Sequence, residues 1–499
     1  MHKLKVKDMD LESGGPLIAI INQEDATTLD LYTADRIRIK KGRKEIVAIT
    51  DIAISNKLLK PGEIGLFEEG LIRLGVKNRE TVSINIDRKP ESLHIIKKKM
   101  NKESLNDKEI RKIVEDIVEG NLNQIELTYY VAANYINGMN DKETVALTKA
   151  MIDTGDRIEI KGKDKIVVDK HCIGGVAGNR TTTIVVPILA AAGLYVPKTS
   201  SRSITSPAGT ADTMEVICNV TLPIEKIEKT IKKTNGCMVW GGAVNLAPAD
   251  DTIINVEHPL SIDAEGQLLA SILAKKGSVS AKYVLIDIPT GKEAKVKTLK
   301  KANHLANQFK KIGSKIGMKV ICTLTDGNEP VGNGIGPGLE ARDILWLFKG
   351  DKRAPQDLIE KSVNLAGLML ELTGKAKKGK GKEMAKELLD SGAASKKFME
   401  IVKAQGARIT KPEKIPLGKY KFNYVSKKTG KIKHISNKHI AKIARIAGCP
   451  KDKKAGLYLH KKKGDWVKKG DIIMTIYSDN STRLKYAKAT FEEINGIKL

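Results

Sequence analysis

The chain is poor in the residues that several classes of protein depend on. Aromatic residues make up 4% of its 499 positions, which leaves little material for stacking nucleic-acid bases. Its five cysteines form no CxxC pair, and no histidine stands near them at a spacing typical of zinc ligands. They are Cys172, Cys218, Cys237, Cys322 and Cys449. Neither a zinc site nor a disulfide framework is indicated, and we expect no metal and no cofactor.

Long apolar runs are missing as well. No stretch of 18 or more apolar residues occurs, and residues 1–10 (MHKLKVKDMD) lack the apolar core of a secretory signal. We therefore expect a cytoplasmic protein with no membrane partner.

Basic residues, by contrast, are abundant. Lysine and arginine number 87 against 59 acidic residues, a formal net charge of +28. This excess makes a basic nucleic-acid-binding protein the alternative from another functional class. The lysines are spread along the whole chain, however, and no zinc-finger, helix-turn-helix or RNP pattern accompanies them. We expect the charge to attract phosphorylated small molecules, with no nucleic-acid partner.

The length allows two to four domains, and the residue patterns divide the chain into four. Residues 1–88 show short strands between Gly, Pro and Asp turns, which predicts a small all-β, barrel-like domain. Residues 89–160, with part of about 250–285, predict a helical domain, in which helices start near Asn106, Asn123 and Asn140.

The second half of the pattern predicts two further domains. Residues 161–410 alternate strand, loop and helix from Ile166 onward, which predicts an α/β domain with a largely parallel sheet. Residues 411–499 are strand-rich and predict an α+β, hammerhead-like domain with a hairpin around residues 428–430. The fold class is thus a multidomain α/β protein.

Two loops of the predicted α/β domain carry anion-binding chemistry. The first, Asp169–Gly178 (DKHCIGGVAG), follows a strand and precedes a helix. Its glycines let backbone N–H groups approach an anion, the helix N-terminus adds positive character, and Lys170 would neutralise a phosphate. A merely tight turn remains the alternative.

The second loop, Thr199–Thr210 (TSSRSITSPAGT), follows the next strand along the chain and is dense in hydroxyl groups with one arginine. Hydroxyl and guanidinium groups are the donors that phosphate oxygens prefer. We interpret it as a second anion-binding loop.

Four segments in order resemble the signatures of the thymidine and pyrimidine-nucleoside phosphorylases: VDKHCIGGVAGNRTT, SSRSITSPAGTADTMEV, LAPADD and ASILAKK. The resemblance runs from about Ile95 to the C-terminus. It implies phosphorolysis of an N-glycosidic bond by inorganic phosphate, a co-substrate, in a helical and an α/β domain that close on the substrate. Among family members the chain is most similar to the archaeal nucleoside-monophosphate phosphorylases, whose N-terminal β domain resembles a double-psi barrel. We therefore expect conversion of AMP, and also CMP and UMP, to free base and ribose 1,5-bisphosphate in AMP catabolism or salvage.

The resemblance also implies roles for individual residues. Lys170, Thr182, Ser200 and Thr210 fall on phosphate-binding positions, while Ser271 and Lys275 fall on positions that touch the base. His171 is kept, with either a direct or a structural role.

Departures from the family pattern favour a different substrate. The serine after DKH is Cys172, the family's TGG is Pro207-Ala-Gly209, and its pyrimidine-binding arginine aligns with Val256. These changes argue against a pyrimidine-only specificity.

An acid is expected because a purine leaves more readily when it is protonated at N7. Asp263, eight residues before Ser271, is the candidate proton donor, and burial would have to raise its pKa for that role. The alternative is an Asp that caps the following helix.

A 5′-phosphate needs more donors than a nucleoside does, and the second loop supplies them where the nucleoside enzymes have mostly Gly and apolar residues. The predicted AMP-binding set is Gly175, Ser201, Arg202, Ser203, Ile204, Thr205, Ser206, Thr210, Ser271, Lys275 and Lys295.

Two enzyme alternatives stay open. One is a pyrimidine-nucleoside phosphorylase acting on thymidine or uridine. The other is an anthranilate-type phosphoribosyltransferase, which would need Mg²⁺ held by acidic residues, and the second loop offers only Asp212 and Glu215. For residues 1–88, which carry no motif of their own, we expect a role in building a homo-oligomer, at least a dimer.

Overall fold

The computed structural model describes residues 2–14, 17–87, 89–162, 164–203, 206–260, 262–494 and 496–499. The chain divides into two compact units, and each is described by itself. The first comprises Met1–Thr154 and Ala247–Ser271, and the second Gly155–Leu246 and Ile272–Leu499.

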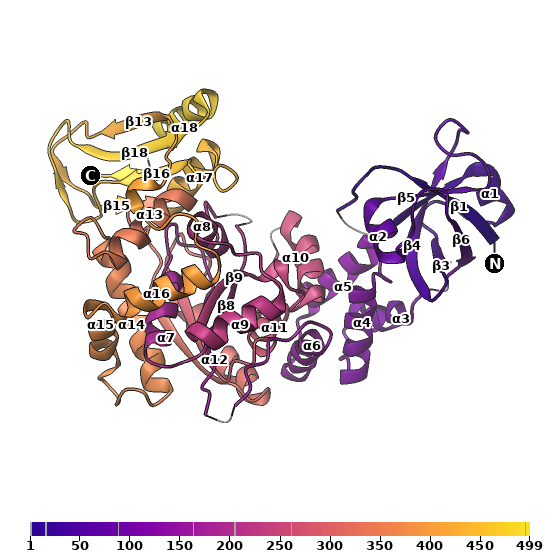
Figure 1. The fold of residues 1–499 in the computed structure, drawn as a ribbon, viewed down its shortest axis with the longest axis horizontal. Coiled ribbons are helices and arrows are strands. Elements are labelled where there is room, and N and C mark those ends of the chain that lie inside the picture. Colours follow the sequence, from indigo (N-terminus) through magenta and orange to yellow (C-terminus); the bar gives the residue numbers. More distant parts are fainter. Residues whose placement is uncertain are drawn as a thin grey trace. The chain divides into compact units, whose positions relative to one another are not determined.

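The N-terminal residues form a closed barrel, drawn in indigo in Figure 1, with strand order β1-β5-β2-β4-β3-β6. The strands are β1 (His2–Asp8), β2 (Ile18–Asn22), β3 (Arg36–Lys41), β4 (Lys44–Ala53), β5 (Glu63–Leu66) and β6 (Thr81–Ile86). Apolar residues at alternate positions, such as Ile37 and Ile39 on β3, are buried and fill the barrel. The barrel-like prediction is confirmed, while the double-psi assignment stays a prediction.

The expectation that this region is all-β is wrong, because the barrel carries two short helices, α1 (Gln23–Thr28) and α2 (Glu68–Leu74). Asn22 caps α1 by accepting a hydrogen bond from the backbone N–H of Glu24 at 2.9 Å. Gly75 ends α2 in the left-handed conformation. Helices this short give too little periodicity to be recognised among strands.

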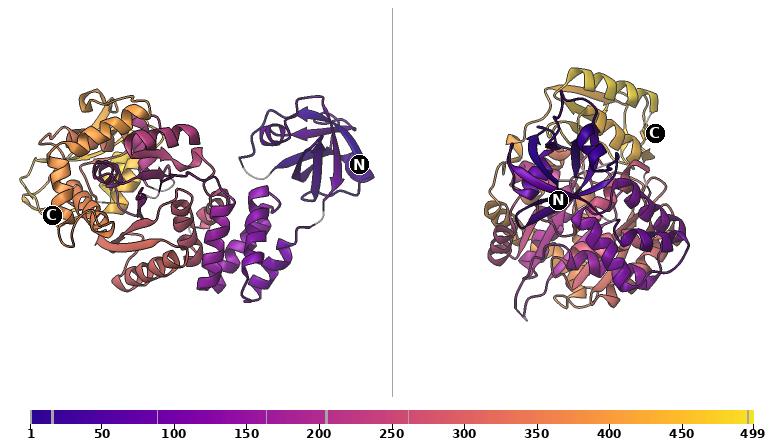
Figure 2. Two further views of the ribbon diagram at one scale, coloured as in Figure 1. Left: turned by 60° about the horizontal axis from the view of Figure 1, so that its bottom comes forward. Right: turned by 90° about the vertical axis from the view of Figure 1, so that its right-hand side faces the viewer.

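The rest of the first unit is helical. Its helices are α3 (Ser92–Met100), α4 (Asp107–Glu119), α5 (Gln124–Asn137), α6 (Asp141–Asp153), α10 (Pro248–Leu260) and the first half of α11 (Glu265–Gly277). α4, α5 and α6 each begin with a capping box, led by Asn106, Asn123 and Asn140 as predicted. These helices pack side by side, as the purple ribbons of Figure 2 show, and α10 joins them by packing on α4 and α5.

The second unit contains parallel strands in two groups. β7 (Val168–Cys172), β10 (Tyr283–Thr290) and β11 (Lys319–Asp326) form a sheet of order β11-β10-β7, and β8 (Val196–Ser200) pairs with β9 (Gly236–Trp240). A parallel bridge between Val167 and Tyr195 connects the groups. The carboxyl ends of β7 and β8 are therefore neighbours, which brings the two predicted loops together.

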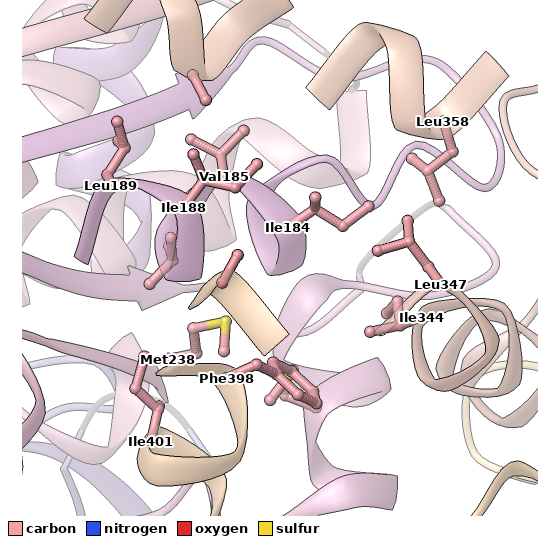
Figure 3. Packing of buried hydrophobic residues seen from close by; sticks show 14 of the residues in the cluster. Ile184, Val185, Ile188, Leu189, Met238, Ile344, Leu347, Leu358, Phe398 and Ile401 are labelled. Carbon is pink, nitrogen blue, oxygen red and sulfur yellow. The ribbon is translucent and has the colours of Figure 1, made fainter. Parts of the chain in front are cut away.

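Helices surround these strands and bury a large apolar core. They are α7 (Thr182–Ala191), α8 (Thr210–Ile217), α9 (Ile224–Thr234), α12 (Leu299–Lys315), α13 (Pro337–Phe348), α14 (Gln356–Leu372), α15 (Gly381–Asp390) and α16 (Ala393–Ala404), with 3-10 turns at Gly241–Ala243 and Pro412–Lys414. Figure 3 shows α7 residues such as Ile184 and Leu189 packed with Met238 of β9 and Phe398 of α16. This core holds the strand ends, and the loops that follow them, in place.

The C-terminal residues, together with the earlier short strand β12, form an antiparallel sheet of order β12-β16-β18-β13 that is accompanied by two helices. The elements are β12 (Gly334–Ile335), β13 (Tyr420–Val425), β14 (Gly430–Lys431), β15 (His434–Ile435), α17 (Asn437–Ala447), β16 (Gly456–Leu459), β17 (Trp466–Val467), β18 (Ile472–Ser478), α18 (Ser481–Ile494) and β19 (Ile497–Lys498). The α+β character is confirmed, and the hammerhead-like description stays a prediction.

The hairpin predicted around residues 428–430 is wrong. β13 pairs with β18, and β14 pairs with β17, so the two halves of the supposed hairpin belong to different sheets. Ser426 turns the chain away, because its hydroxyl donates to the Lys428 carbonyl at 2.6 Å and its backbone N–H donates to Asp471. Pairing with distant strands overrides the local turn signal.

Candidate active site

The first predicted loop begins later than the sequence indicates. Lys170 and His171, expected in the loop, lie within β7, which runs to Cys172. A charged residue can occupy a buried strand only when partners compensate it. The side chains of Asp169 and Lys170 point to opposite faces of the sheet, and each has its own set of partners.

Asp169 anchors a buried cluster on one face of β7. Its carboxylate accepts a hydrogen bond from Lys276 Nζ at 2.6 Å and forms an ion pair with Lys198 Nζ at 3.2 Å. Burial alone would raise the pKa of Asp169, but the two lysines outweigh burial and hold that pKa lowered. Burial and these lysines also keep the pKa of His171 well below its ordinary value, so its ring is neutral near pH 7.

Asp287 of β10 anchors a second cluster, on the face that Lys170 occupies. Lys170 Nζ lies 3.9 Å from Asp287 Oδ2 and donates to Thr181 Oγ1 at 2.7 Å, and Lys361 Nζ lies 3.6 Å from the same carboxylate oxygen. Thr325 donates to the other oxygen at 2.6 Å. We call Lys170, Lys361 and Asp287 the Asp287 cluster.

The Asp287 cluster carries two lysines for one carboxylate in a buried setting. Burial lowers the pKa of Lys170, which is 1% exposed, because an ammonium group is poorly solvated there. An anion beside the cluster would stabilise both ammonium groups. Burial also raises the pKa of the neighbouring Cys172 thiol to about 11, so Cys172 is a neutral thiol near pH 7.

Hydroxyl groups occupy the starts of the helices that follow the two loops. Thr182 is the first residue of α7 and Thr210 the first of α8, where unpaired N–H groups and the helix dipole favour an anion. Ser200 ends β8, and its buried Oγ has no hydrogen-bond partner among the residues that the structure describes. Buried hydroxyl groups are rarely left unsatisfied, so Ser200 marks a place for a ligand atom.

Arg180 joins the first loop to the second. Its buried guanidinium donates to Glu340 and to the carbonyl of Ala208, and Glu340 also accepts hydrogen bonds from Thr213 at 2.8 Å and from Gly336 N at 3.1 Å. The relative position of the two loops is therefore determined by a buried, fully bonded ion pair.

Arg202, expected to bind the 5′-phosphate, is engaged by acidic residues. Its guanidinium donates two hydrogen bonds of 2.7 Å to Glu215, lies 3.4 Å from Asp212 and stacks on Trp240. Lys453 pairs with the same two carboxylates at 3.1 and 3.2 Å. The hydrogen bonds from Arg202 lower the pKa of Glu215 to about 2. We call Arg202, Lys453, Glu215 and Asp212 the Arg202 cluster.

The remaining second-loop residues are partly occupied with one another. Ser203 N–H donates to Asp212 at 2.8 Å, the Ser203 hydroxyl donates to the carbonyl of Ser206, and Ser201 is exposed. Gly209 packs so closely beneath the loop that a Cβ there would lie 2.5 Å from the Ser201 carbonyl oxygen. Ile204 and Thr205 lie outside the described residues.

Gly175 and Lys295 meet, although 120 positions separate them in the sequence. Gly175 has a φ of +89°, and a Cβ there would lie 2.6 Å from the backbone nitrogen of Lys295. The Lys295 side chain is exposed. The structure thus brings two predicted AMP-binding residues together.

The predicted base-binding and acid residues lie around α11. Ser271 Oγ donates to Asp250 Oδ2 at 2.8 Å, Lys275 follows one turn later, and Asp263 lies two residues before the helix. Asp263 is exposed, so the burial that its role as an acid requires is not present in this unit.

Several residues of the site were not predicted from the sequence. Lys198, Lys276 and Asp287 are buried around Asp169 and Lys170, Lys361 is partly buried beside Asp287, and Arg180 links the loops. Their spacing carries no motif. The one usable signal is a charged residue within an apolar strand pattern, as in VLIDIP.

Two features are absent from the described residues. No group of three His, Cys, Asp or Glu side chains there could hold a metal ion. In the same residues no helix is long and apolar enough to cross a membrane. A hollow of about 430 Å³ at the ends of β10 and β11, lined by Thr290, Lys292, Asp326 and Asn328 among others, contains none of the predicted site residues.

Comparison with protein families matches three segments of the chain. Residues 93–155 match the helical bundle domain of a glycosyl transferase family, residues 164–395 its a/b domain, and residues 431–498 the pyrimidine nucleoside phosphorylase C-terminal domain. The AMP phosphorylase of Methanococcus aeolicus is 46% identical, covering 100% of this chain and 98% of that protein. This chain belongs to the AMP phosphorylase family.

Other members of the AMP phosphorylase family are equally similar. The AMP phosphorylase of Methanocaldococcus jannaschii is 46% identical over 97% of this chain and 95% of its own, and AMP phosphorylase 1 of Archaeoglobus fulgidus is 45% identical over 95% and 93%. Among solved structures, anthranilate phosphoribosyltransferase from Thermus thermophilus has a TM-score of 0.52 at 18% identity, covering 62% of this chain and 98% of its own. That likeness shows the shared fold alone.

Proposed function

We propose that this protein is a phosphorylase that cleaves the N-glycosidic bond of AMP with inorganic phosphate, releasing adenine and ribose 1,5-bisphosphate. The observation that carries the proposal is the Asp287 cluster, in which the buried Lys170 and the partly buried Lys361 share one carboxylate, and Lys170 also bonds Thr181 just before α7. The unsatisfied Ser200 hydroxyl and the starts of α7 and α8 support the same anion site.

The reaction needs the phosphate to be held and dehydrated before it attacks the sugar carbon. Lys170, Thr182, Ser200 and Thr210 bind the phosphate oxygens, and burial strengthens these charge-assisted bonds. His171, neutral near pH 7, adds no further positive charge. No metal or cofactor is part of this proposal.

Departure of the base is the second requirement. Asp263 protonates the purine as the sugar–base bond breaks, and Ser271 and Lys275 contact the base. Because Asp263 is exposed, this role requires that bound substrate cover it. Asp263→Asn should lower kcat on AMP by about 10²- to 10⁴-fold with a much smaller effect on AMP affinity. Unchanged turnover would remove Asp263 from the mechanism.

The direct test is to incubate the protein with AMP, with and without orthophosphate, and to follow adenine by chromatography and the sugar product by its two phosphates. Adenine release that depends on phosphate is expected. No adenine under either condition would refute the proposal. CMP and UMP should also react, whereas faster turnover of uridine or thymidine would favour the pyrimidine-nucleoside alternative.

The remaining parts of the proposal concern the cell and the assembly. The protein acts in the cytoplasm in AMP catabolism or salvage, and residues 1–88 build a homo-oligomer of at least two chains. Mass measurement by light scattering, on the full chain and on residues 89–499, tests the second point. An unchanged assembly without the barrel would contradict it.

A further inference from the structure

The start of α17 in the C-terminal region forms hydrogen bonds with a loop of the α/β region. Ser436 Oγ donates to Glu293 Oε2 at 2.8 Å, and the backbone N–H of Lys438 donates to the same oxygen at 3.2 Å. His434 Nε2 lies 3.4 Å from Glu293 Oε1. We call residues 434–438 the α17 bracket.

The same bracket also holds the first glycine-rich loop. Asn437, only 2% exposed, accepts a hydrogen bond from Ala177 N at 3.2 Å and donates one to the carbonyl of Gly327 at 2.8 Å. An amide side chain is required here, because one contact needs an acceptor and the other a donor. Asn437 thus joins the loops that follow β7 and β11.

A third set of bonds fixes the bracket itself. Glu329 accepts hydrogen bonds of 2.8 Å from His434 Nδ1 and from the backbone N–H of Ile435. Lys463 Nζ lies 3.3 Å from Glu329. The bracket is therefore tied to the loop after β11 at two points, through Glu329 and through the carbonyl of Gly327.

Glu293 and Ala177, two of the residues that the bracket bonds, lie close in sequence to a backbone contact between two predicted AMP-binding residues, Gly175 and Lys295. Glu293 is two residues before Lys295, and Ala177 is two residues after Gly175. Gly175 and Lys295 are so close that a Cβ at Gly175 would lie 2.6 Å from Lys295 N. A shift of either loop would therefore separate Lys295 from Gly175 or force them to clash.

From this arrangement we propose that the α17 bracket is a positioning element of the nucleotide site: it sets the affinity for the 5′-phosphate by holding Gly175 and Lys295 in register, without touching the substrate. The proposal rests on the proposed function for the identity of the substrate. If Glu293 were released, its carboxylate would lie two residues from Lys295 and would compete with a phosphate for that ammonium group. The C-terminal region would thus form part of the active site's supporting structure.

The test uses the full chain and the variants Ser436→Ala, Asn437→Ala and Glu293→Ala. Each should raise the KM for AMP about fivefold to tenfold, with kcat within about twofold and the KM for phosphate unchanged. Adenosine, which has no 5′-phosphate, should be turned over as by the wild type. Ser436→Thr keeps the hydroxyl and should restore the KM, whereas Asn437→Asp lacks the donor and should not.

A matched control is Ser478→Ala, which removes a buried hydroxyl of the same region that donates to Ala447 instead. It should leave the KM for AMP unchanged. AMP binding is also measured by calorimetry without phosphate, so that the bracket is tested even if no cleavage occurs. Wild type that binds AMP without cleaving it would refute the proposed function alone.

Two outcomes would overturn the bracket proposal. One is an unchanged AMP affinity in folded Ser436→Ala, Asn437→Ala and Glu293→Ala proteins. The other is an equal loss for AMP, adenosine and phosphate, which would mean general destabilisation. Thermal unfolding of each variant shows whether it is folded, and Glu293→Ala removes the contact from the other side if the α17 variants do not fold.

Discussion

The two anion-binding loops differ in how their cations are balanced. In the Asp287 cluster, Lys170 and Lys361 share one buried carboxylate. In the Arg202 cluster, Arg202 and Lys453 face two carboxylates, Glu215 and Asp212. The first has positive charge to spare for an anion, and the second is balanced. A lysine or arginine in a sequence motif can therefore attract an anionic ligand only when nearby carboxylates do not already balance its charge.

The largest expected effect is on the cluster with surplus charge. Lys170→Met should reduce kcat/KM for AMP by about a thousandfold, because a buried donor to the attacking phosphate is lost. Adenine release measures this. Lys161→Met, at an exposed lysine of the same unit, is the control and should keep full activity. A folded Lys170→Met protein with normal turnover would contradict the inference that the Asp287 cluster binds the attacking phosphate.

Removing the shared carboxylate should sharpen the comparison. Asp287→Asn leaves the buried Lys170 and the partly buried Lys361 without a counter-charge and should lower the free energy of unfolding by about 3 kcal/mol. Orthophosphate should recover part of the lost thermal stability, and recover more than it adds to the wild type, because it supplies the missing negative charge. Thermal melts with and without phosphate measure both effects; an unaffected melting temperature would mean that Asp287 does not compensate the lysines.

The balanced cluster should give a smaller, substrate-specific effect. Arg202→Ala should raise the KM for AMP about tenfold and leave adenosine unaffected, provided the guanidinium turns from Glu215 to the 5′-phosphate. Steady-state kinetics on both substrates measure this. Arg353→Ala, which breaks an arginine–carboxylate pair with Asp351, is the matched control. An equal loss of kcat/KM on AMP and adenosine would mean that the second loop does not bind the 5′-phosphate.

The smallest effect concerns pH. Because Arg202 lowers the pKa of Glu215 to about 2, this carboxylate contributes stability that is fully present above its unfolded pKa of about 4.3 and is lost as pH falls toward 2. With solvent screening, the contribution is about 1 kcal/mol. Unfolding of wild type and Glu215→Gln between pH 6 and pH 3 should show a stability difference that shrinks with falling pH. A constant difference would contradict the ion pair.

The sequence determined local structure and the chemistry of the loops. Capping boxes, which depend on residues three positions apart, predicted the starts of three helices at Asn106, Asn123 and Asn140. The strand-loop-helix rhythm also placed hydroxyl groups at the ends of parallel strands. Such interactions join residues that are only a few positions apart, so the sequence alone is enough to predict them.

Tertiary structure alone decided which distant groups meet. Asp287 lies more than one hundred residues from Lys170, and the two carboxylates that pair with Arg202 also pair with the distant Lys453. The supposed hairpin at residues 428–430 gave way to pairing with β17 and β18 for the same reason. Charge balance and strand pairing are set by groups that the fold brings together from remote positions, and no local pattern records those groups.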